Sequence, residues 1–517
     1  MNRRSFLSLA AATAASPVRA TPAPDRRPNI VLLLTDDQRY DAMGCMGDSE
    51  IETPNMDRLA RDGVLFGNHY DTTAICMASR ACIMTGMYEY KTGCNFEHGS
   101  LSAAKFAKSY PVLLREAGYH TGFAGKFGFA VTPEMSSNAA YGSYDRLPVN
   151  QFDWWRGWTG QGSYETARNK YMKEYAGEYP HVTRALGAAA QEFIRESAGS
   201  KQPFCLSISF KAPHKPPVPD PAFDGVYAGK TFSKPPNWGP MGMAHLPTQA
   251  LSGRQFIQRF EWYPEAVYQE RLRKYYQQIY GVDVALGMIR DELERRGVAD
   301  NTVVLFTSDN GYFCGSHFFQ GKVLPYEEGA RAPLIIHDPR RPPTDKQRVA
   351  TGIYDPRRPR ADKQLRATGI TGNIDLAPTV LELAGLPAPG NIDGRSLIPL
   401  LDDGNADVHE SLLLTQVWPF SKKCQALAVV TRKYKYIYWY YGDVLTPPAE
   451  ELYDRLEDRY EMHNVADHPE HRAALERMRK IYDRHLRRWK ENAVPGNGYP
   501  KYSRLADRHI SWREKEF

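Results

Sequence analysis

The 517-residue sequence predicts an α/β fold, with a large, mostly parallel central sheet flanked by helices and a small C-terminal α+β subdomain. Short aliphatic runs alternate with helical patterns through most of the chain, which is the order expected of a parallel sheet. After about residue 405 the pattern changes to closely spaced strands and one charged helix. The length also exceeds what one hydrophobic core usually serves, so two structural units are expected.

The main unit is predicted over residues 25–405. Asn29 to Leu34 is a continuous run of Ile, Val and Leu, which is typical of a strand buried on both faces. Thr53 and Pro54 then open a helix that Gly63 closes, because Thr caps helices and Pro suits the first helical position. Further strands are expected over 64–69, 118–124, 204–210 and 302–307, and helices over 110–117, 181–197 and 264–296.

The C-terminal subdomain is predicted over residues 406–517. Strands are expected over 411–417, 426–430 and 434–441, the last from an aromatic run. A charged amphipathic helix is expected from Pro469 to about Asn492. These elements predict antiparallel strands with a helix packed on one face.

The composition excludes several classes of protein. Hydrophobic residues make up 42% of the chain and charged residues 24%, and no apolar run is long enough to span a membrane. The formal net charge of +6 is too small to indicate a nucleic-acid partner. The seven cysteines contain no Cys-x-x-Cys pair, so neither a zinc site nor a dense disulfide framework is predicted.

The first twenty residues resemble an export signal. Arg3 and Arg4 precede a short apolar stretch, and Val18-Arg19-Ala20 resembles a cleavage site. The arginine pair favours a twin-arginine signal peptide over residues 1–20, while an ordinary secretory signal or a basic tail are the alternatives. We therefore expect a periplasmic or secreted protein.

A basic segment over residues 338–370 is internally duplicated. Residues 338–353 and 355–370 match at 12 of 16 positions. Two copies are too few for a repeat architecture, so we interpret the segment as a duplicated surface loop. A basic lip over a polyanionic substrate is the alternative.

Acidic and amide side chains follow two of the predicted strands directly. Asp36 and Asp37 follow the first strand, and Asp309 and Asn310 follow the strand over 302–307. Ligands gather at the carboxyl ends of strands in open α/β sheets, so the two pairs are expected to converge on one cation. Three carboxylates and an amide oxygen favour Ca²⁺ or Mg²⁺ over zinc.

A candidate nucleophile lies in the segment Cys76-Met77-Ala78-Ser79-Arg80. The start of an apolar helical turn and Arg80 would both attract negative charge at this thiol. The residues alone permit either a thiolate nucleophile or an oxyanion pocket.

The segment Cys-x-Ala-Ser-Arg, followed by Thr85-Gly86, resembles the signature of the type I sulfatase family of the alkaline phosphatase-like superfamily, whose cysteine is oxidised to formylglycine. Ala78 replaces the usual proline, which bears on the enzyme that performs the oxidation. The resemblance extends over most of the chain. The further matching segments are Pro28 to Asp37, Thr53 to Asp57, Gly125-Lys126, Ala212 to His214, Thr307 to Gly311, Gly321-Lys322, Tyr326 to Glu328, Arg331 to Pro333, Asn373 to Gly385, Glu451 to Asp454 and Tyr460 to Met462.

The resemblance implies a sulfuric ester hydrolase that acts on a sulfated carbohydrate through hydrated formylglycine. Its maturation partner would be a formylglycine-generating enzyme. The implied metal ligands, with Ca²⁺ favoured and Mg²⁺ possible, are Asp36, Asp37, Cys76, Asp309 and Asn310. The other implied catalytic residues are Arg80, which positions the nucleophile, Lys126 and Lys322, which offset charge on the sulfuryl oxygens, and His214, which protonates the leaving alcohol. His317 is a weaker candidate for a substrate contact.

One position departs from the family pattern. The family has a histidine two residues after the lysine of the Gly-Lys motif, but this chain has Gly128. That histidine is thought to assist sulfate release, and His98 and His120 are candidate substitutes.

Two alternative functions remain at this stage. A formylglycine-dependent phosphodiesterase or phosphonate monoester hydrolase would share the site, and Gly128 also permits a non-catalytic glycan-binding pseudosulfatase. Substrate specificity is expected in the loops over 135–162 and 230–263. The aromatic residues Trp154, Trp155 and Trp158 are predicted either to stack on sugar rings or to pack in the core.

Overall fold

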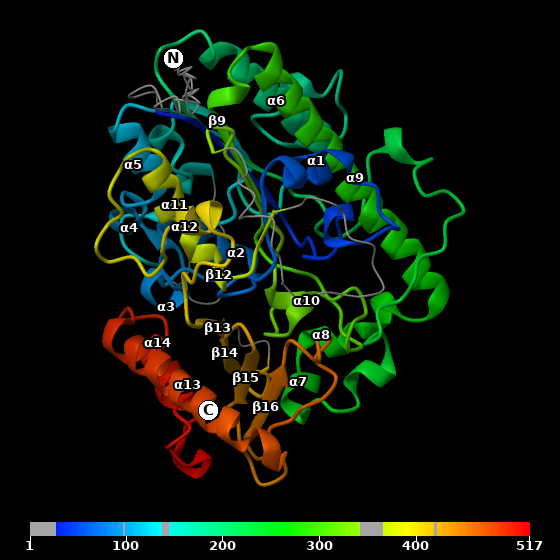
Figure 1. Cartoon of the computed structure of the whole chain (residues 1–517), viewed down its shortest axis with the longest axis vertical. Helices are drawn as coiled ribbons and strands as arrows, with labels where there is room; N and C mark the ends of the chain where they lie inside the picture. The colour runs from blue at the N-terminus through cyan, green and yellow to red at the C-terminus, as the bar shows by residue number, and fades with distance from the viewer. Residues whose placement is uncertain (1–26, 97–98, 137–143, 342–364, 418–420) are drawn as a thin grey trace, which may run out of the picture.

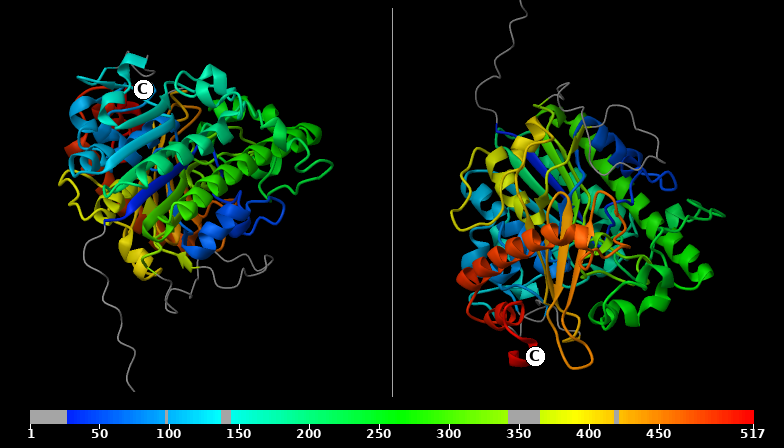
Figure 2. Two further views of the ribbon diagram at one scale, coloured as in Figure 1. Left: turned by 90° about the horizontal axis from the view of Figure 1, so that it is seen from above. Right: turned by 60° about the horizontal axis from the view of Figure 1, so that its bottom comes forward.

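The computed structural model describes residues 27–96, 99–136, 144–341, 365–417 and 421–517. Over these residues an eight-stranded sheet lies between two layers of helices (Figures 1 and 2), in the strand order β11-β2-β10-β9-β1-β8-β5-β7. The predicted signal peptide over 1–20, most of the duplicated segment over 338–370, and His98 lie outside the described residues. The strands of this sheet are β1 (Asn29–Thr35), β2 (Val64–Phe66), β5 (His120–Lys126), β7 (Trp154–Trp158), β8 (Phe204–Ser209), β9 (Thr302–Ser308), β10 (Leu334–His337) and β11 (Leu365–Ala367).

The central strand β1 divides the core between the two faces of the sheet. All seven of its residues are buried, as the continuous aliphatic run predicts. Because side chains alternate along a strand, Val31 and Leu33 pack in one core cluster, and Ile30 and Leu32 pack in another. The first cluster is closed by α1 (Pro54–Asp62), α6 (Val182–Ser197) and α9 (Glu265–Arg295), and the second by α2 (Cys76–Thr85), α5 (Tyr110–Glu116), α11 (Leu376–Leu383) and α12 (Ile398–Asp402).

The four neighbouring strands β5, β8, β1 and β9 run parallel to one another. In this register Thr35 lies opposite Ser308, and Leu34 lies opposite Ser209. The backbone N–H of Asp36 donates to the carbonyl of Ala212 at 3.1 Å, beyond the end of β8. The segments that follow these strands therefore emerge together at one edge of the sheet, as expected for an α/β fold.

One local prediction needs correction, and the structure decides between two alternatives for the tryptophans. The strand predicted over 64–69 is interrupted, because β2 ends at Phe66 and β3 (His69–Tyr70) pairs with β12 (Thr371–Gly372) in a separate small sheet. Trp155 and Trp158 are 7% and 1% exposed, and Trp154 packs on Phe193 with 5.3 Å between the ring centroids. Trp155 and Trp158 are therefore core residues and Trp154 is partly buried against the core, which supports the packing alternative.

A four-stranded antiparallel sheet forms the C-terminal part of the chain, at the bottom of Figure 1. Its strands are β13 (Leu412–Gln416), β14 (Ala426–Val430), β15 (Tyr434–Trp439) and β16 (Ala449–Asp454), and α13 (Arg472–Asn492) packs on them. Its hydrophobic core also includes Tyr70, Cys82 and Phe313 from the main unit. The two units therefore share one core, while the predicted boundary near residue 405 remains a prediction.

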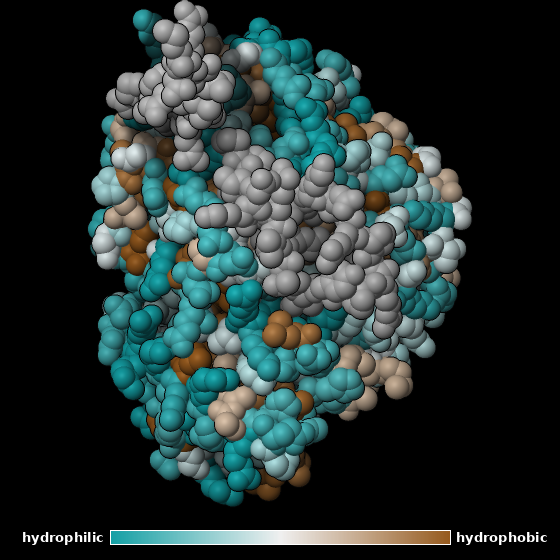
Figure 3. Space-filling model, in the orientation of Figure 1, coloured by the Kyte–Doolittle hydropathy of each residue, from teal (hydrophilic) through white to brown (hydrophobic). Residues whose placement is uncertain are grey.

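The remaining helices and strands are short. None of the helices over the described residues combines the length and apolar character that a membrane crossing requires. The face of the molecule in Figure 3 is mostly hydrophilic, with hydrophobic residues in small scattered groups. These elements are α3 (Glu89–Thr92), β4 (Leu101–Ser102), α4 (Ala103–Phe106), β6 (Val131–Thr132), α7 (Thr248–Leu251), α8 (Arg254–Ile257), α10 (Glu327–Ala330) and α14 (Tyr499–Leu505).

A buried ion network joins the C-terminal sheet to the main unit. The Lys435 ammonium on β15 lies 2.6 Å from Glu327 and 2.7 Å from Glu461, and Arg455 approaches Glu327 at 3.4 Å. Burial would raise the pKa of Glu327, but Lys435, Arg455 and Arg331 outweigh burial and hold it well below its usual range. Burial raises the pKa of Glu461 to about 7. Lys435 is the cation that pairs with both Glu327 and Glu461, so the burial of these two carboxylates depends on its charge.

Replacing Lys435 by methionine should destabilise the protein strongly, because Glu327 and Glu461 would remain buried without this cation. We expect a loss of about 3–5 kcal/mol in the free energy of unfolding, measured by urea denaturation. Lys433→Met is the matched control, since Lys433 is 53% exposed in its pair with Asp454 and exposed pairs contribute roughly 0–1 kcal/mol. Equal effects of the two substitutions would contradict a structural role for the network.

Candidate active site

A cavity of about 240 Å³ opens at the carboxyl edge of the parallel strands. Its lining includes Asp37, Cys76, His214 and Lys322. Atoms of Asp36, Asp37, Cys76 and His214 all lie within 4.8 Å of one another. Residues that are distant in the sequence are therefore brought together where the sequence analysis predicted a site.

Cys76 is the first residue of α2, a helix whose ten residues are all buried. The helix begins after the extended residue Ile75 and ends at Gly86, which takes the left-handed conformation with φ 70°. The Cys76 thiol donates to Asp36 Oδ1 at 3.2 Å and accepts from Lys322 Nζ at 2.8 Å. Burial raises the pKa of Cys76, and Asp309 and Asp36 raise it further. As a cysteine this residue is thus a neutral thiol and a poor nucleophile.

Three carboxylates surround the thiol. Burial would raise the pKa of Asp36, but Lys126, His214, Lys322 and Arg80 outweigh it and hold that pKa well below its usual range. Burial raises the pKa of Asp37 to about 6, because the attraction of Lys322 offsets burial only in part. Burial also raises the pKa of Asp309. The cluster therefore holds carboxylates that need positive charge nearby.

The donor set fits a hard divalent cation. Asp309 Oδ1 accepts from the backbone N–H of Asp37 at 3.4 Å, and Asn310 Nδ2 donates to Asp37 Oδ1 at 2.6 Å. The buried atoms Asp37 Oδ2 and Asn310 Oδ1 accept no hydrogen bond from any described residue. Carboxylate and amide oxygens of this kind are the ligands that Ca²⁺ and Mg²⁺ take, so Asp36, Asp37, Asp309 and Asn310 are suited to hold such an ion.

Three cations contact the carboxylates directly. The ammonium groups of Lys126 and Lys322 form ion pairs with Asp36 and Asp37, respectively. Arg80 Nε donates to Asp309 Oδ2 at 2.7 Å, and Arg80 Nη1 donates to the carbonyl of Lys126 at 2.6 Å. Arg80 thus ties α2 to the ends of β5 and β9.

His214 lies at the side of the cluster. Its Nδ1 lies 2.6 Å from the carbonyl oxygen of Lys215, so Nδ1 carries a proton and donates it there. Its Nε2 lies 3.8 Å from Asp37 Oδ2 and is the atom available for proton transfer. Burial lowers the pKa of His214 well below its usual value, although Asp36 opposes the shift.

Gly128 leaves space for Arg80. Its φ of +91° is strained for any residue with a side chain, and a Cβ atom at this position would lie 2.5 Å from Arg80 Cδ. A histidine at 128 is therefore incompatible with this placement of Arg80.

Two other histidines lie away from the cluster. His120 begins β5, whereas Lys126 ends it, so the strand separates them by roughly 20 Å at 3.3 Å per residue. His120 instead stacks on Phe193 with 5.1 Å between the ring centroids, so it is not a substitute for the missing histidine.

His317 is fully buried and interacts with Asn237 at 3.1 Å and the carbonyl of Gly242 at 3.0 Å. Because His317 does not line the cavity, the structure gives no support to its predicted substrate contact.

Sequence reasoning missed two residues beside the cluster. Gln161 Oε1 accepts from Lys126 Nζ at 2.7 Å, and the Gln161 carbonyl accepts from Lys211 Nζ at 3.1 Å. Burial lowers the pKa of Lys211 to about 8, and repulsion by Lys126 contributes. Lys211 lies two residues beyond the end of β8, as Asp37 lies two residues beyond the end of β1. A charged residue just after a buried strand is the sequence signal that could have identified Lys211.

Comparison with known proteins identifies the family. The family model described as sulfatase matches residues 28–386, and a second, described as N-sulphoglucosamine sulphohydrolase C-terminal, matches residues 356–487. The chain belongs to the sulfatase family. An N-acetylglucosamine-6-O-sulfatase of Bacteroides thetaiotaomicron is 27% identical over 94% of this chain and 91% of the relative. Sulfatases generally use formylglycine and a divalent metal ion. This agrees with the prediction that Cys76 is a formylglycine precursor beside a metal site.

Solved structures confirm the fold of this sulfatase. A structure with the ligand D-glucosamine-2-N,6-O-disulfate, described as its substrate, has a TM-score of 0.70 and 24% identity, and the match covers 91% of this chain and 99% of that one. A phosphonate monoester hydrolase of Agrobacterium radiobacter has a TM-score of 0.68 and 21% identity, with 88% and 94% covered. At these identities the similarity concerns the fold alone.

Placing alanine at Gly128 should displace Arg80 and reduce sulfatase activity. We expect roughly a tenfold or larger fall in kcat, because small misplacements in a catalytic site are costly, together with about 1–3 kcal/mol of backbone strain. Gly297→Ala is the matched control, since Gly297 has φ +65° with no described atom within 4 Å of its Cβ position. Unchanged kcat in Gly128→Ala, measured on an aryl sulfate, would contradict the packing argument.

Proposed function

We propose that this sulfatase hydrolyses sulfate esters of carbohydrates, with Cys76 oxidised to formylglycine. The observation that carries the proposal is the placement of Cys76. It begins a buried helix, and its side chain contacts Asp36 and Lys322 at the floor of the cavity. A residue there faces both the carboxylates that can hold a cation and the cations that can hold a sulfate.

The chemistry comes from two groups. Hydrated formylglycine at position 76 would supply the hydroxyl that attacks sulfur, and Asp36, Asp37, Asp309 and Asn310 would hold a divalent cation whose charge favours loss of the hydroxyl proton. We propose Ca²⁺, which accepts several carboxylates in flexible geometry, with Mg²⁺ as the alternative.

The cations of the chain orient the reacting groups. Lys322 contacts the Cys76 side chain and lies on the cavity wall, so it is placed to bind sulfuryl oxygens. Lys126 is held by Gln161 beside Asp36, where its charge stabilises the same oxygens. Fixed cations in a buried site stabilise developing negative charge strongly, because they need no reorganisation during the reaction.

His214 is the proposed proton donor to the leaving alcohol. The Lys215 carbonyl fixes the ring through Nδ1, so Nε2 faces the cavity. Burial lowers the pKa of His214 in the protein alone, whereas a bound anionic sulfate ester opposes this effect. Substrate binding therefore favours a proton on Nε2 at the moment the S–O bond breaks.

The names of the relatives support a substrate class to test. The B. thetaiotaomicron relative is named for N-acetylglucosamine 6-sulfate, so we propose a sulfated amino sugar as the first substrate to test. We also propose maturation by a formylglycine-generating enzyme and export to the periplasm or beyond through the twin-arginine signal of residues 1–20. The phosphonate monoester hydrolase alternative is supported by fold similarity alone.

Cys76→Ala should abolish sulfate-ester hydrolysis, because the substitution removes the precursor of the nucleophile. Activity is measured on p-nitrophenyl sulfate with the chain produced together with a maturation enzyme. Peptide mass spectrometry should find formylglycine at 76, and Cys82, on the neighbouring tryptic peptide, serves as an unmodified internal control. An intact thiol at 76 in fully active protein would refute the mechanism, and faster turnover of an aryl phosphate diester than of the sulfate would favour the alternative function.

His214→Ala should affect substrates according to their leaving groups. An alcohol needs a proton as it leaves, so kcat on a sugar sulfate should fall by about 10²–10⁴. p-Nitrophenol leaves readily as an anion, so the aryl sulfate should lose much less. His120→Ala provides the control, since His120 lies at the far end of β5. Equal losses on both substrates would exclude His214 as the proton donor.

A further inference from the structure

One buried hydroxyl in the wall of the cavity is not used by the proposed mechanism. Tyr312 is 4% exposed, and it lines the cavity together with Cys76 and His214. It follows Asn310 by two residues, so the Cα atoms of these two residues are at most roughly 7 Å apart. Because the cavity measures only about 240 Å³, a substrate bound at Cys76 also lies against Tyr312.

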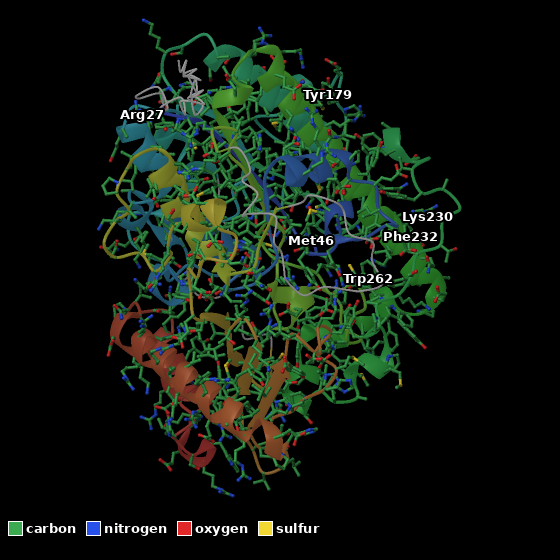
Figure 4. The ribbon with its side chains drawn as sticks, in the orientation of Figure 1. Arg27, Met46, Tyr179, Lys230, Phe232 and Trp262 are labelled. Atoms are coloured by element: carbon green, nitrogen blue, oxygen red, sulfur yellow. The ribbon has the colours of Figure 1, made fainter. Side chains whose placement is uncertain are left out.

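Other aromatic rings hold the ring of Tyr312 in place. It stacks on Tyr275 with 6.0 Å between the ring centroids, and it packs edge-on against Trp262, labelled in Figure 4, at 6.1 Å. The Tyr275 hydroxyl donates to the carbonyl of Asp37 at 2.6 Å. The ring on which Tyr312 stacks is therefore tied to the proposed cation site, and Tyr312 has a fixed position beside it.

The hydrogen bonds of Gln320 show how the Tyr312 hydroxyl is used. Gln320 Nε2 lies 3.1 Å from Glu261 Oε2 and 2.8 Å from the Tyr312 hydroxyl oxygen. A carboxylate only accepts hydrogen bonds, so the Gln320 atom that faces Glu261 must be the amide nitrogen. That nitrogen donates and does not accept, so the Tyr312 oxygen is the acceptor in this bond. The phenol proton of Tyr312 is thus left for another partner.

That partner is not found among the described residues, none of which accepts a hydrogen bond from Tyr312. A buried hydroxyl proton without an acceptor is unfavourable. Since Tyr312 lines the cavity, the cavity is the side from which a bound molecule can supply the acceptor. The Tyr312 proton is therefore an unused donor at the place where the substrate binds.

Tyr312 lies on the side of the cavity where the leaving group is expected. Glu261, which orients Gln320, also pairs with Lys215 at 3.4 Å, and Lys215 directly follows His214. This chain of contacts connects Tyr312 with the segment that carries the proposed proton donor to the leaving alcohol. The alcohol is the sugar itself, so an acceptor bound at Tyr312 belongs to the sugar.

We propose that Tyr312 donates a hydrogen bond to a hydroxyl oxygen of the leaving sugar, and that Gln320 positions the Tyr312 hydroxyl for this contact. The inference rests on the proposed function and deepens it. Tyr312 selects a carbohydrate leaving group over an aromatic alcohol that has no such hydroxyl. A neutral phenol suits a neutral hydroxyl, whereas Lys126 and Lys322 provide the charge that the sulfate requires. Tyr312 thus determines specificity, and Gln320 is a positioning residue.

The test compares kcat/KM on N-acetylglucosamine 6-sulfate with kcat/KM on p-nitrophenyl sulfate. Tyr312→Phe should lower the ratio of the two values roughly fivefold, which is the effect of one neutral hydrogen bond. Gln320→Met keeps the length of the side chain and removes its amide, so it should lower the ratio in the same direction. In Tyr312→Phe protein, adding Gln320→Met should change the ratio no further, because both residues act through one hydroxyl.

Tyr268→Phe is the matched control. Tyr268 packs on the same Trp262 ring at 6.1 Å, but its hydroxyl donates to the carbonyl of Ser233 at 3.1 Å, and it lies outside the lining of the cavity. This variant should keep the wild-type ratio. Thermal unfolding midpoints check that all variants are folded.

An unchanged ratio in Tyr312→Phe, or losses that add in the double variant, would overturn the inference. Hydrolysis of the aryl sulfate alone would contradict both the sugar substrate and the inference that depends on it. Failure of the proposed function as a whole would appear differently, as the absence of Cys76-dependent hydrolysis of both esters.

Discussion

The site depends on a balance of buried charge at the carboxyl edge of the sheet. Asp36, Asp37 and Asp309 pair with Lys126, Lys322 and Arg80, respectively, and all three carboxylates are buried. Buried charges are costly unless they are paired, so each acidic residue requires its partner for the edge to fold. A divalent cation would change this balanced cluster into one with excess positive charge, which suits it to hold a sulfate ester.

Arg80 is important for this charge balance, because its side chain contacts residues of β5 and β8 and the residue that follows β9. It is 1% exposed, and it reaches from α2 to Asp309 after β9 and to the carbonyl of Lys126 on β5. Gly128 provides the space that this side chain needs. The glycine at position 128, where the family has a histidine, is thus what allows the Arg80 side chain to pass.

Much of the fold could be predicted from the sequence, because periodicity reports burial directly. The aliphatic run of β1 and the long helix α9 were identified within one or two residues, and strand ends located the acidic pairs. The sequence gives no comparable signal for tertiary packing, so it left open whether Trp155 lies in the core or in a sugar site. The predicted strand over 118–124 already separates His120 from Lys126, but the stacking of His120 on Phe193 could not be predicted from the sequence. Gln161 escaped notice because a single polar residue in a loop carries no pattern, whereas the position of Lys211 just beyond β8 was a signal that could have been used.

The burial of Cys76 has a consequence for the order of events in the life of the chain. The residue is 1% exposed at the floor of a cavity of about 240 Å³, which admits a small molecule but not the active site of another protein. For the proposed oxidation, a modifying enzyme would therefore have to reach the cysteine before α2 packs between the sheet and its neighbouring helices. On this proposal, folding would close the interval in which Cys76 can be oxidised, and a chain that folded first would keep a buried thiol at this position.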